Sequence, residues 1–390
     1  MSSDYHKDLA RWMPLLVKVW RSRGAKASNK RPRFEEDDDD GTLTPHEQKQ
    51  VAQGVRTLSL GLTRDRQLAG AKYMDDPALL GAYLLFYWPV SYAQARQALG
   101  ELPRAREVLD LGSGPGPMSF AALDAGAGAV TSADRSKAAL DLAKALATEA
   151  TEPIATREWS PDRPLPDGQF DLVLMGHVIN ELFHDSKDVL DKRTALLEQV
   201  LAKVKPRGSL LILEPALRDT SRALLALRDR LVAKGYAVRA PCLYRGNCPA
   251  LVKESDWCHA ERDWKMPPVV EAIARLAGIH KDSLKMSYLA LAPKGEAWAE
   301  PPPGRLFRIV SEPLEGKGRL RFMGCGPEGR VGLAMQQKHS TEANKVFFKL
   351  PRGTVVKLDV TEPRGDGLAL DDRSTVQVIA WPGQPVPPQK

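Results

Sequence analysis

Short apolar runs alternate with amphipathic stretches between residues 105 and about 293, and this pattern predicts strands alternating with helices. The candidate strands are 107–111, 129–133, 170–176, 208–214 and 284–291. Helices are expected between them at 117–123, 135–149, 187–204, 219–234 and 268–277. Such alternation is typical of the α/β class, in which helices cover both faces of a parallel sheet.

The pattern is purely helical before this region. Within 45–104 we expect helices over 45–60, 65–74 and 77–99, with a kink or break in the third at Pro89. Residues 1–44 form an arm that is expected to be flexible except for a short helix over 9–20. No chemistry is evident in this N-terminal part.

The pattern changes again after the Pro-rich linker at 299–304. Short alternating strands are expected at 305–311, 317–323, 330–336, 345–350 and 353–360. They predict a small β-barrel-like domain over 305–362, followed by a flexible tail over 363–390. The α/β domain is then 105–298, with a Cys-rich insertion at 240–268 that interrupts its alternation.

Composition narrows the class of protein. A chain of 390 residues exceeds the ~250–300 at which a single core stops growing, so several domains are expected. No apolar run approaches the ~18 residues of a membrane span, and the N-terminus has no apolar signal region. We therefore expect a cytoplasmic protein without a membrane partner, whose thiols are reduced.

Positive charge is in excess and unevenly placed. The net charge is +7, and residues 1–34 contain nine Lys or Arg against two Asp. Residues 35–40 are six consecutive acids. Charge blocks usually form solvated linkers, and the alternative is a basic arm for RNA phosphates.

A glycine-rich turn follows the first predicted strand of the α/β region. The stretch 108–116 reads Val-Leu-Asp-Leu-Gly-Ser-Gly-Pro-Gly, and a predicted helix comes directly after it. Glycines allow close approach of a ligand, and the helix N-terminus offers free N–H groups. Asp134 ends the next strand, 22 residues after Gly112, near the offset of a carboxylate that binds a ribose. These features predict a nucleotide-cofactor site.

The order of these motifs resembles the class I S-adenosylmethionine (SAM)-dependent methyltransferases over about 105–293. The glycines follow D-x-G-x-G-x-G rather than the G-x-G-x-x-G of a dehydrogenase, which is the competing interpretation. The resemblance implies that the glycine loop holds the methionine part of SAM, Asp110 lies near its amine, Asp134 binds the ribose and Trp159 stacks on the adenine. The cofactor-binding residues expected on this basis are Asp110, Gly112, Ser113, Gly114, Gly116, Asp134 and Trp159.

The methyl acceptor is less evident. Amino-directed methyltransferases often carry an Asn/Asp-Pro-Pro-aromatic motif after the fourth strand, but residues 176–182 read Gly-His-Val-Ile-Asn-Glu-Leu. His177 and Glu181 are acid/base candidates by position, although such residues more often cap a helix or pack beside the cofactor. No catalytic residue is assigned, and the sequence supports SAM binding better than methyl transfer.

All four cysteines are candidates for one metal site. Cys242, Cys248 and Cys258 have the spacing C-x5-C-x9-C, and Cys325 follows after 66 intervening residues. Zinc sites prefer C-x2–4-C pairs, whereas four thiolates from irregular loops suit an iron–sulfur cluster. From the residues alone, a cluster, zinc and free thiols all remain open.

The Cys-x5-Cys-Pro and Trp-Cys-His segments, with a fourth cysteine in a β-domain, resemble one group closely. It is the methyltransferase-like small-ribosomal-subunit family, which comprises mitochondrial small-subunit assembly factors and their bacterial relatives. The resemblance runs over about 45–360. It implies a [4Fe–4S] cluster on Cys242, Cys248, Cys258 and Cys325, with His259 outside the ligand set, and binding to small-subunit rRNA.

Basic residues of the β-domain fit such a partner. They are Arg305, Arg308, Lys317, Arg319, Arg321, Arg330, Lys338, Lys345, Lys349, Arg352 and Lys357. Phe307, Phe322, Phe347 and Phe348 lie between them and are expected to form the interior rather than to stack on bases. We expect either an rRNA methyltransferase or a non-catalytic SAM-fold assembly factor in translation, with no DNA partner. A small-molecule methyltransferase is the third alternative.

Overall fold

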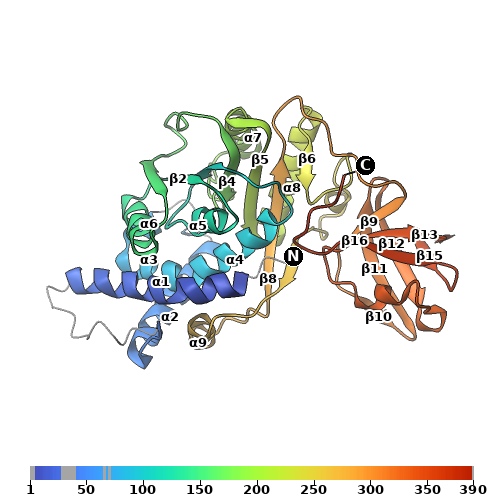
Figure 1. Ribbon diagram of the computed structural model, residues 1–390, viewed down its shortest axis with the longest axis horizontal. Coiled ribbons are helices and arrows are strands. Elements are labelled where there is room, and N and C mark those ends of the chain that lie inside the picture. The colour runs from blue at the N-terminus through green and yellow to red at the C-terminus, as the bar shows by residue number, and fades with distance from the viewer. Residues whose placement is uncertain (1–4, 28–40, 65–66, 69–71, 389–390) are drawn as a thin grey trace.

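The computed structural model describes residues 5–27, 41–64, 67–68 and 72–388 (Figure 1). The acidic block at 35–40, for which the sequence predicts a solvated linker, lies outside these residues.

An eight-stranded sheet forms the centre of the larger domain. Its strands are β1 (Glu107–Leu111), β2 (Ala129–Asp134), β3 (Ile154–Glu158), β4 (Phe170–Gly176), β5 (Val204–Pro215), β6 (Val238–Ala240), β7 (Ala260–Asp263) and β8 (Ser283–Leu291). Their order is β3-β2-β1-β4-β5-β8-β6, and β7 also pairs with β8. Strands β1 to β5 are parallel, and β8 runs antiparallel to β5. A mostly parallel sheet built from alternating strands and helices is the α/β class that the sequence predicts, so the predicted fold class is confirmed.

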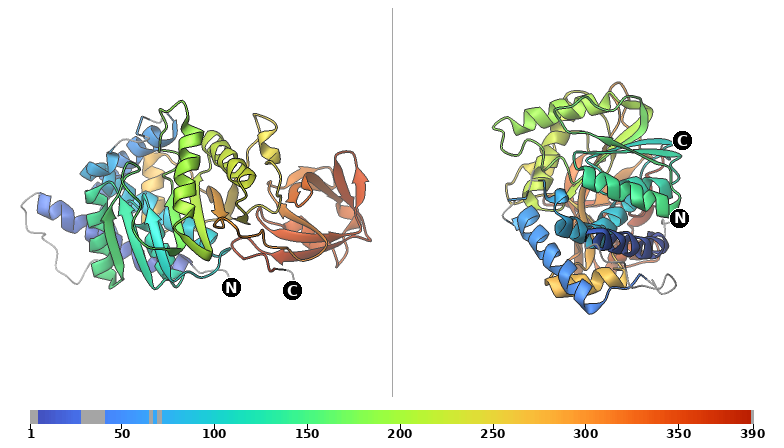
Figure 2. Two further views of the ribbon diagram at one scale, coloured as in Figure 1. Left: turned by 90° about the horizontal axis from the view of Figure 1, so that it is seen from above. Right: turned by 90° about the vertical axis from the view of Figure 1, so that its left-hand side faces the viewer.

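Helices cover both faces of this sheet (Figures 1 and 2). One layer consists of α4 (Trp88–Leu99), α5 (Pro117–Asp124) and α6 (Lys137–Ala150), and the other of α7 (Val189–Leu201) and α8 (Arg218–Ala233). Alternation along β1 explains the two cores, because Val108 packs on the first layer while Leu109 and Leu111 pack on the second. The order reverses between β1 and β4, which creates a switch point at the carboxyl edge of the strands.

The N-terminal helix is longer than the sequence predicts. Helix α1 spans Tyr5–Ala27 and packs on the methyltransferase-like domain, so this part of the expected arm is not free. Trp12 is fully buried beside the rings of Trp88 and Phe120, and its indole donates to Asp124 at 2.7 Å. Burial of this aromatic residue explains why the helix is docked.

Further helical elements lie between α1 and α4 along the chain. They are α2 (Pro45–Ser59), η1 (Leu60–Arg64), η2 (Tyr73–Asp75), α3 (Pro77–Ala82) and η3 (Tyr83–Tyr87). Thr44 and Glu47 form a capping box at the start of α2, which packs against α9 (Pro268–Ala277). The predicted third helix is present as α3, η3 and α4 in succession, and Pro89 lies in the first turn of α4. Because proline has no N–H donor, the π-helical turn η3 precedes it in place of a sharp break.

The C-terminal domain is a second eight-stranded sheet. Its strands are β9 (Arg305–Ile309), β10 (Leu314–Gly316), β11 (Arg319–Gly326), β12 (Gly329–Gln336), β13 (Val355–Asp359), β14 (Glu362–Arg364), β15 (Gly367–Leu370) and β16 (Thr375–Ala380). The pairing order is β14-β15-β12-β11-β9-β13-β16, and β10 pairs with β11. Short helical turns occur at η5 (Gln337–His339) and η6 (Lys345–Lys349), and η4 (Pro249–Leu251) lies in the Cys-rich insertion.

The structure of this domain departs from the sequence expectations at two places. The predicted strand at 345–350 is the 3-10 helix η6, which turns Phe347 into the core and leaves Lys345 and Lys349 exposed. Residues 363–380, expected in a flexible tail, contain β15 and β16, because Leu368, Leu370 and Val376 join the same apolar core. Phe307 and Phe322 are also buried there, as the sequence predicts for the interior.

Candidate cofactor site and cysteine cluster

A cavity of about 630 Å³ opens at the carboxyl edge of β1, β2 and β4, under the N-terminal segment. Gly112, Gly114, Asp134 and Trp159, which the sequence predicts as cofactor residues, line it. The other three predicted residues, Asp110, Ser113 and Gly116, are not among the described residues that form its wall. Ligands of open α/β sheets bind at such a switch point.

The glycine loop has a backbone that larger residues tolerate poorly. Gly112, Gly114 and Gly116 have φ angles of 74°, 53° and 81°. A Cβ on Gly112 would lie 2.6 Å from Cγ2 of Val178, so a side chain there is excluded by contact as well as by strain. The indole of Trp88 donates to the carbonyl of Pro115 at 3.1 Å and fixes the loop to α4.

Asp134 connects this loop to the end of β2. Its Oδ2 accepts from the Gly114 N–H and its Oδ1 from the Ser136 N–H, both at 2.8 Å. Burial raises the pKa of the Asp134 carboxyl, and the two backbone donors oppose that effect. The carboxylate therefore lies at the cavity wall in a fixed orientation.

Asp110 has a different environment from the one that the resemblance implies. Its side chain is 1% exposed and accepts a hydrogen bond from the Ser119 hydroxyl at 2.7 Å. Ser119 in turn contacts the hydroxyl of Ser132. Burial raises the pKa of the Asp110 carboxyl to about 7. Its visible role is to join β1 to α5.

Trp159 follows β3 and is 4% exposed. Its backbone N–H donates to the Asp134 carbonyl at 3.0 Å, which places the two predicted ribose and adenine residues side by side. The indole N–H has no hydrogen-bond partner within the described part of the chain. Buried N–H groups are usually hydrogen-bonded, so an acceptor atom of a bound ligand would stabilise the indole N–H at this cavity wall.

His177 lies at the end of β4 with a φ of 58° and lines the same cavity. The Gln94 amide nitrogen donates to the Lys285 carbonyl at 2.9 Å, so its oxygen faces His177 Nε2 at 3.0 Å. The imidazole must then carry its proton on Nε2, which leaves Nδ1 as the basic nitrogen. Burial, with a smaller contribution from Lys281, lowers the pKa of His177 to about 4.

The N-terminal segment forms part of the cavity wall, although its sequence gave no sign of this. Met74 lies over Gly114, and Asp75 accepts from the Ser136 hydroxyl at 2.8 Å. Tyr73 donates to Glu181 at 3.4 Å. These residues are 40 or more positions from their partners, so no local periodicity could have indicated them.

The four cysteines lie within electrostatic range of one another. Cys242, Cys248 and Cys258 come from the insertion and Cys325 from β11. Burial is the main cause of the raised pKa of Cys248, Cys258 and Cys325, and Cys242 raises each of these pKa values further. Their surroundings are cationic, with Arg228, Arg308, Arg330 and Arg352 acting on them. Within the described ranges, no three His, Cys, Asp or Glu side chains converge as an ion-binding group.

Helix α8 holds the insertion in place. The buried Arg228 guanidinium donates to the carbonyls of Tyr244 and Gly246. Asp229 accepts from the Cys248 N–H at 2.9 Å. Arg222 donates to the Ala250 carbonyl at 3.1 Å and to other carbonyls of the same loop. Two cysteine-bearing segments are thus positioned by side chains of one helix.

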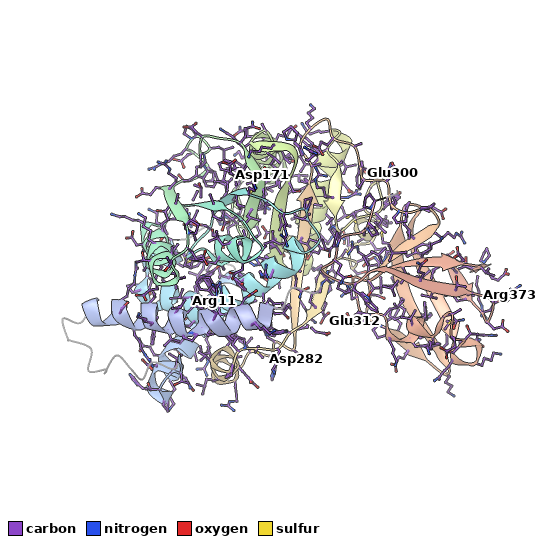
Figure 3. The ribbon with its side chains drawn as sticks, viewed as in Figure 1. Arg11, Asp171, Asp282, Glu300, Glu312 and Arg373 are labelled. Carbon is purple, nitrogen blue, oxygen red and sulfur yellow. The ribbon has the colours of Figure 1, made fainter. Side chains whose placement is uncertain are left out.

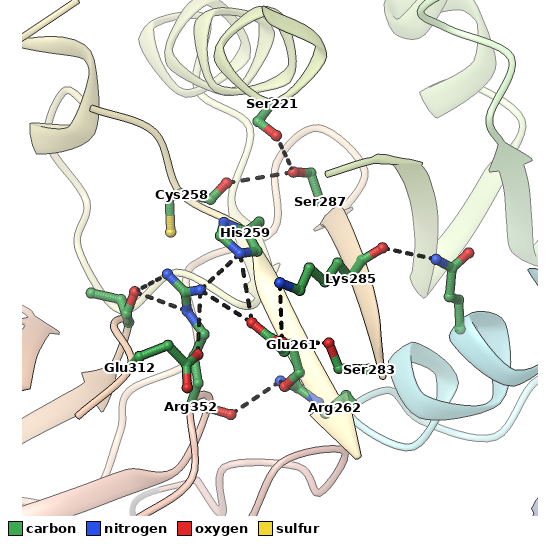
Figure 4. A network of polar contacts seen from close by, with 12 residues as sticks. Ser221, Cys258, His259, Glu261, Arg262, Ser283, Lys285, Ser287, Glu312 and Arg352 are labelled. Atoms are coloured by element: carbon green, nitrogen blue, oxygen red, sulfur yellow. Dashed lines mark hydrogen bonds and ion pairs between the residues drawn. The ribbon is translucent and has the colours of Figure 1, made fainter. Parts of the chain in front are cut away.

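The insertion also meets the C-terminal domain through polar contacts (Figure 4). Arg352 contacts Nε2 of His259 at 2.8 Å and lies near Glu261 and Glu312. Arg330 pairs with Asp256, and Arg308 pairs with Glu101 at 3.1 Å. Three of the basic residues that the sequence assigns to an RNA face are therefore engaged at the domain interface. The sequence could not reveal this, because their partners across the interface are 74 or more residues away.

A family model described as mitochondrial small ribosomal subunit Rsm22 matches residues 79–353, more than half of the chain. The chain belongs to the Rsm22 family. The matched range contains the glycine loop and all four cysteines, so the resemblance stated from the sequence is confirmed.

The family's description names mitochondria and does not support the expected cytoplasmic location. Of the helices in the described ranges, none is long and apolar enough to cross a membrane.

Other comparisons give fold likeness only. No curated protein matches the chain. A ribosomal protein L11 methylase from Lactobacillus delbrueckii subsp. bulgaricus is 18% identical over 53% of this chain and 78% of its own, with a TM-score of 0.32. An O-methyltransferase family protein from Burkholderia thailandensis is 16% identical over 65% of this chain and 75% of its own, with a TM-score of 0.39. The plantazolicin methyltransferase BpumL, in complex with S-adenosylhomocysteine, is 10% identical over 64% and 98%, with a TM-score of 0.34. Scores this low carry no argument about function.

Proposed function

We propose that this Rsm22-family chain binds SAM in the cavity at the carboxyl edge of β1, β2 and β4. The observation that carries the proposal is the convergence of the glycine loop, Asp134 and Trp159 on one cavity at the switch point. Gly112 and Gly114 would hold the methionine part, Asp134 the ribose hydroxyls and Trp159 the adenine. Ser113 and Gly116 shape the loop, and Asp110 supports it through α5. SAM supplies an electrophilic methyl group.

The partner in this proposal is RNA of the small ribosomal subunit. Family membership supports it, and so do the exposed basic residues that the domain interface leaves available. These are Arg305, Lys317, Arg321, Lys338, Lys345 and Lys349. Phosphate contacts by such side chains give affinity without base specificity. Binding should therefore weaken steeply as salt rises.

Methyl transfer to rRNA is the first of two versions. His177 is the acid/base candidate for it by position, because its neutral imidazole lines the cavity, although a pKa of about 4 makes it a weak base. The second version is an assembly factor that binds SAM and RNA without transfer. The absence of an Asn/Asp-Pro-Pro-aromatic motif at 176–182 favours it. A small-molecule acceptor fits the basic C-terminal surface least well.

One assay separates these versions. Purified small subunits are incubated with methyl-labelled SAM and either the wild-type chain or the Gly112→Ala variant. Gly126→Ala is the matched control, because Gly126 also has a positive φ, of 97°, but nothing lies near its Cβ position. Label in rRNA from wild type and control, but not from Gly112→Ala, supports the enzyme. Co-sedimentation with subunits but no labelled rRNA supports the assembly factor. Failure to co-sediment removes the RNA partner from the proposal.

We further propose that Cys242, Cys248, Cys258 and Cys325 hold a [4Fe–4S] cluster, with zinc as the alternative. The support is the chemistry of the donor set: four thiols act on one another electrostatically, and nearby guanidinium groups suit a cluster whose thiolates bring net negative charge. In the described residues the four thiols do not converge as a ready ion-binding group. The cluster would then join the insertion to β11 and fix the two domains. Anaerobic purification followed by iron, sulfide and zinc analysis tests this. A colourless protein with stoichiometric zinc would overturn it.

A further inference from the structure

Lys281 is a cation on the wall of the cofactor cavity, in the loop between α9 and β8. The strand order β2-β1-β4-β5-β8 separates this loop from Asp134 and Trp159, which lie at the ends of β2 and β3. Lys281 thus belongs to the half of the cavity opposite the proposed ribose and adenine sites. With SAM bound as proposed above, a methyl acceptor would enter this half.

No acid neutralises Lys281 within the described part of the chain, where it makes neither a hydrogen bond nor an ion pair. The neighbouring Asp282 is exposed and lies at the surface (Figure 3). Among the acids of the cavity wall, Asp134 accepts from two backbone N–H groups and Asp75 from Ser136. Glu181 accepts from Tyr73.

Two other basic groups of the cavity wall, Lys285 and His177, do not substitute for it. Lys285 pairs with Glu261 at 3.3 Å, on the side of the domain interface. The His177 ring is neutral, since burial and Lys281 together lower its pKa. Lys281 is partly buried, and this burial lowers its pKa to about 8 without any contribution from a carboxylate. An anionic group of a ligand would supply the missing counter-ion.

We infer that Lys281 is an anion subsite of the cavity, which binds a phosphodiester oxygen of an RNA strand entering as the methyl acceptor. Lysine is a compact point charge that suits a phosphate oxygen. The exposed basic residues of the C-terminal domain point to the same polyanion. This inference rests on the proposed function for the identity of the strand. The observation that Lys281 has no counter-ion at the cavity wall does not depend on the proposed function.

The acylation rate of Lys281 tests the inference directly. The full-length protein is treated with an amine-reactive ester, and modification at each lysine is followed by mass spectrometry. Lys294, which is exposed and outside the cavity wall, is the reference. A short single-stranded RNA should slow acylation of Lys281 at least threefold relative to Lys294. Inorganic phosphate should do so only at higher concentration, and S-adenosylhomocysteine should not.

The carboxylate of SAM is the competing anion, and a second measurement excludes or establishes it. The Lys281→Gln variant should bind S-adenosylhomocysteine within twofold of wild type, while Lys294→Gln is unchanged in every assay. A tenfold loss of S-adenosylhomocysteine affinity, or protection of Lys281 by that ligand alone, would assign the lysine to the cofactor and overturn the RNA subsite. Protection by neither RNA nor phosphate would also overturn it. Failure of the wild type to bind S-adenosylhomocysteine at all would instead remove the proposed SAM site.

Discussion

Gln94 of α4 holds the imidazole of His177 in one tautomer, with its amide oxygen 3.0 Å from Nε2. The same amide donates to the Lys285 carbonyl on β8, so one buried side chain connects an N-terminal helix, the end of β4 and β8. The Gln94→Leu variant should lose about 1–3 kcal/mol of unfolding free energy, because His177 Nε2 and the Lys285 carbonyl lose their hydrogen-bond partner. Chemical denaturation measures this. Gln53→Leu, at an exposed position of α2, should stay within about 0.5 kcal/mol of wild type.

His177 should remain neutral well below pH 6. Burial is the main cause of its pKa of about 4, and the charge of Lys281 adds to it. Titration of the imidazole by NMR should show no protonation down to about pH 5. In Lys281→Gln the pKa should rise, because a like charge has been removed. A His177 that titrates near 6.5 in the wild type would contradict the described environment.

Glu214, at the end of β5, should be protonated at neutral pH. Burial raises the pKa of its carboxyl to about 8, and Oε2 has no partner in the described structure. A folded-state pKa above the unfolded value means that the contribution to stability is full below about pH 4.5 and is lost as pH rises towards 8. As pH rises across that window, the free energy of unfolding of wild type should therefore fall, relative to Glu214→Gln, by up to about 1.4 kcal/mol per pH unit. Parallel unfolding curves of the two proteins from pH 5 to 8 would refute this.

Glu101 should be essential for the docking of the two domains. It lies between α4 and β1, is 7% exposed, and pairs with Arg308 at 3.1 Å and Arg262 at 3.3 Å. Glu101→Ala leaves two buried guanidinium groups without their carboxylate and should cost about 3–5 kcal/mol. Limited proteolysis should then cleave the linker at 299–304 faster.

The control for this variant is Glu107→Ala. The Glu107 side chain is 58% exposed where it pairs with Lys205, so its removal should cost no more than about 1 kcal/mol. Equal effects of the two variants on stability and on linker cleavage would show that Glu101 does not fix the domains.

The sequence predicts the parallel sheet, the glycine loop and the second β-domain, because each depends on local periodicity or on a short motif. It predicts Gly112, Asp134 and Trp159 at one cavity, since strand ends of a parallel sheet meet at one edge. The sequence does not predict which side chains from distant parts of the chain contact one another. Asp110 is buried and accepts a hydrogen bond from Ser119 of α5, a contact that the glycine motif does not indicate. Gln94 and Lys281 reach the cavity only through tertiary packing, and no pattern in the chain marks them.

Binding of S-adenosylhomocysteine to the full-length protein, measured by isothermal titration, tests the central claim most directly. The account predicts one site per chain, an affinity reduced at least tenfold by Gly112→Ala, and little change in Gly126→Ala. The Gly112 substitution places a Cβ against Val178, whereas the Gly126 substitution adds backbone strain alone. An absence of binding heat in the folded wild-type protein, or equal affinity in the wild type and Gly112→Ala, would contradict it.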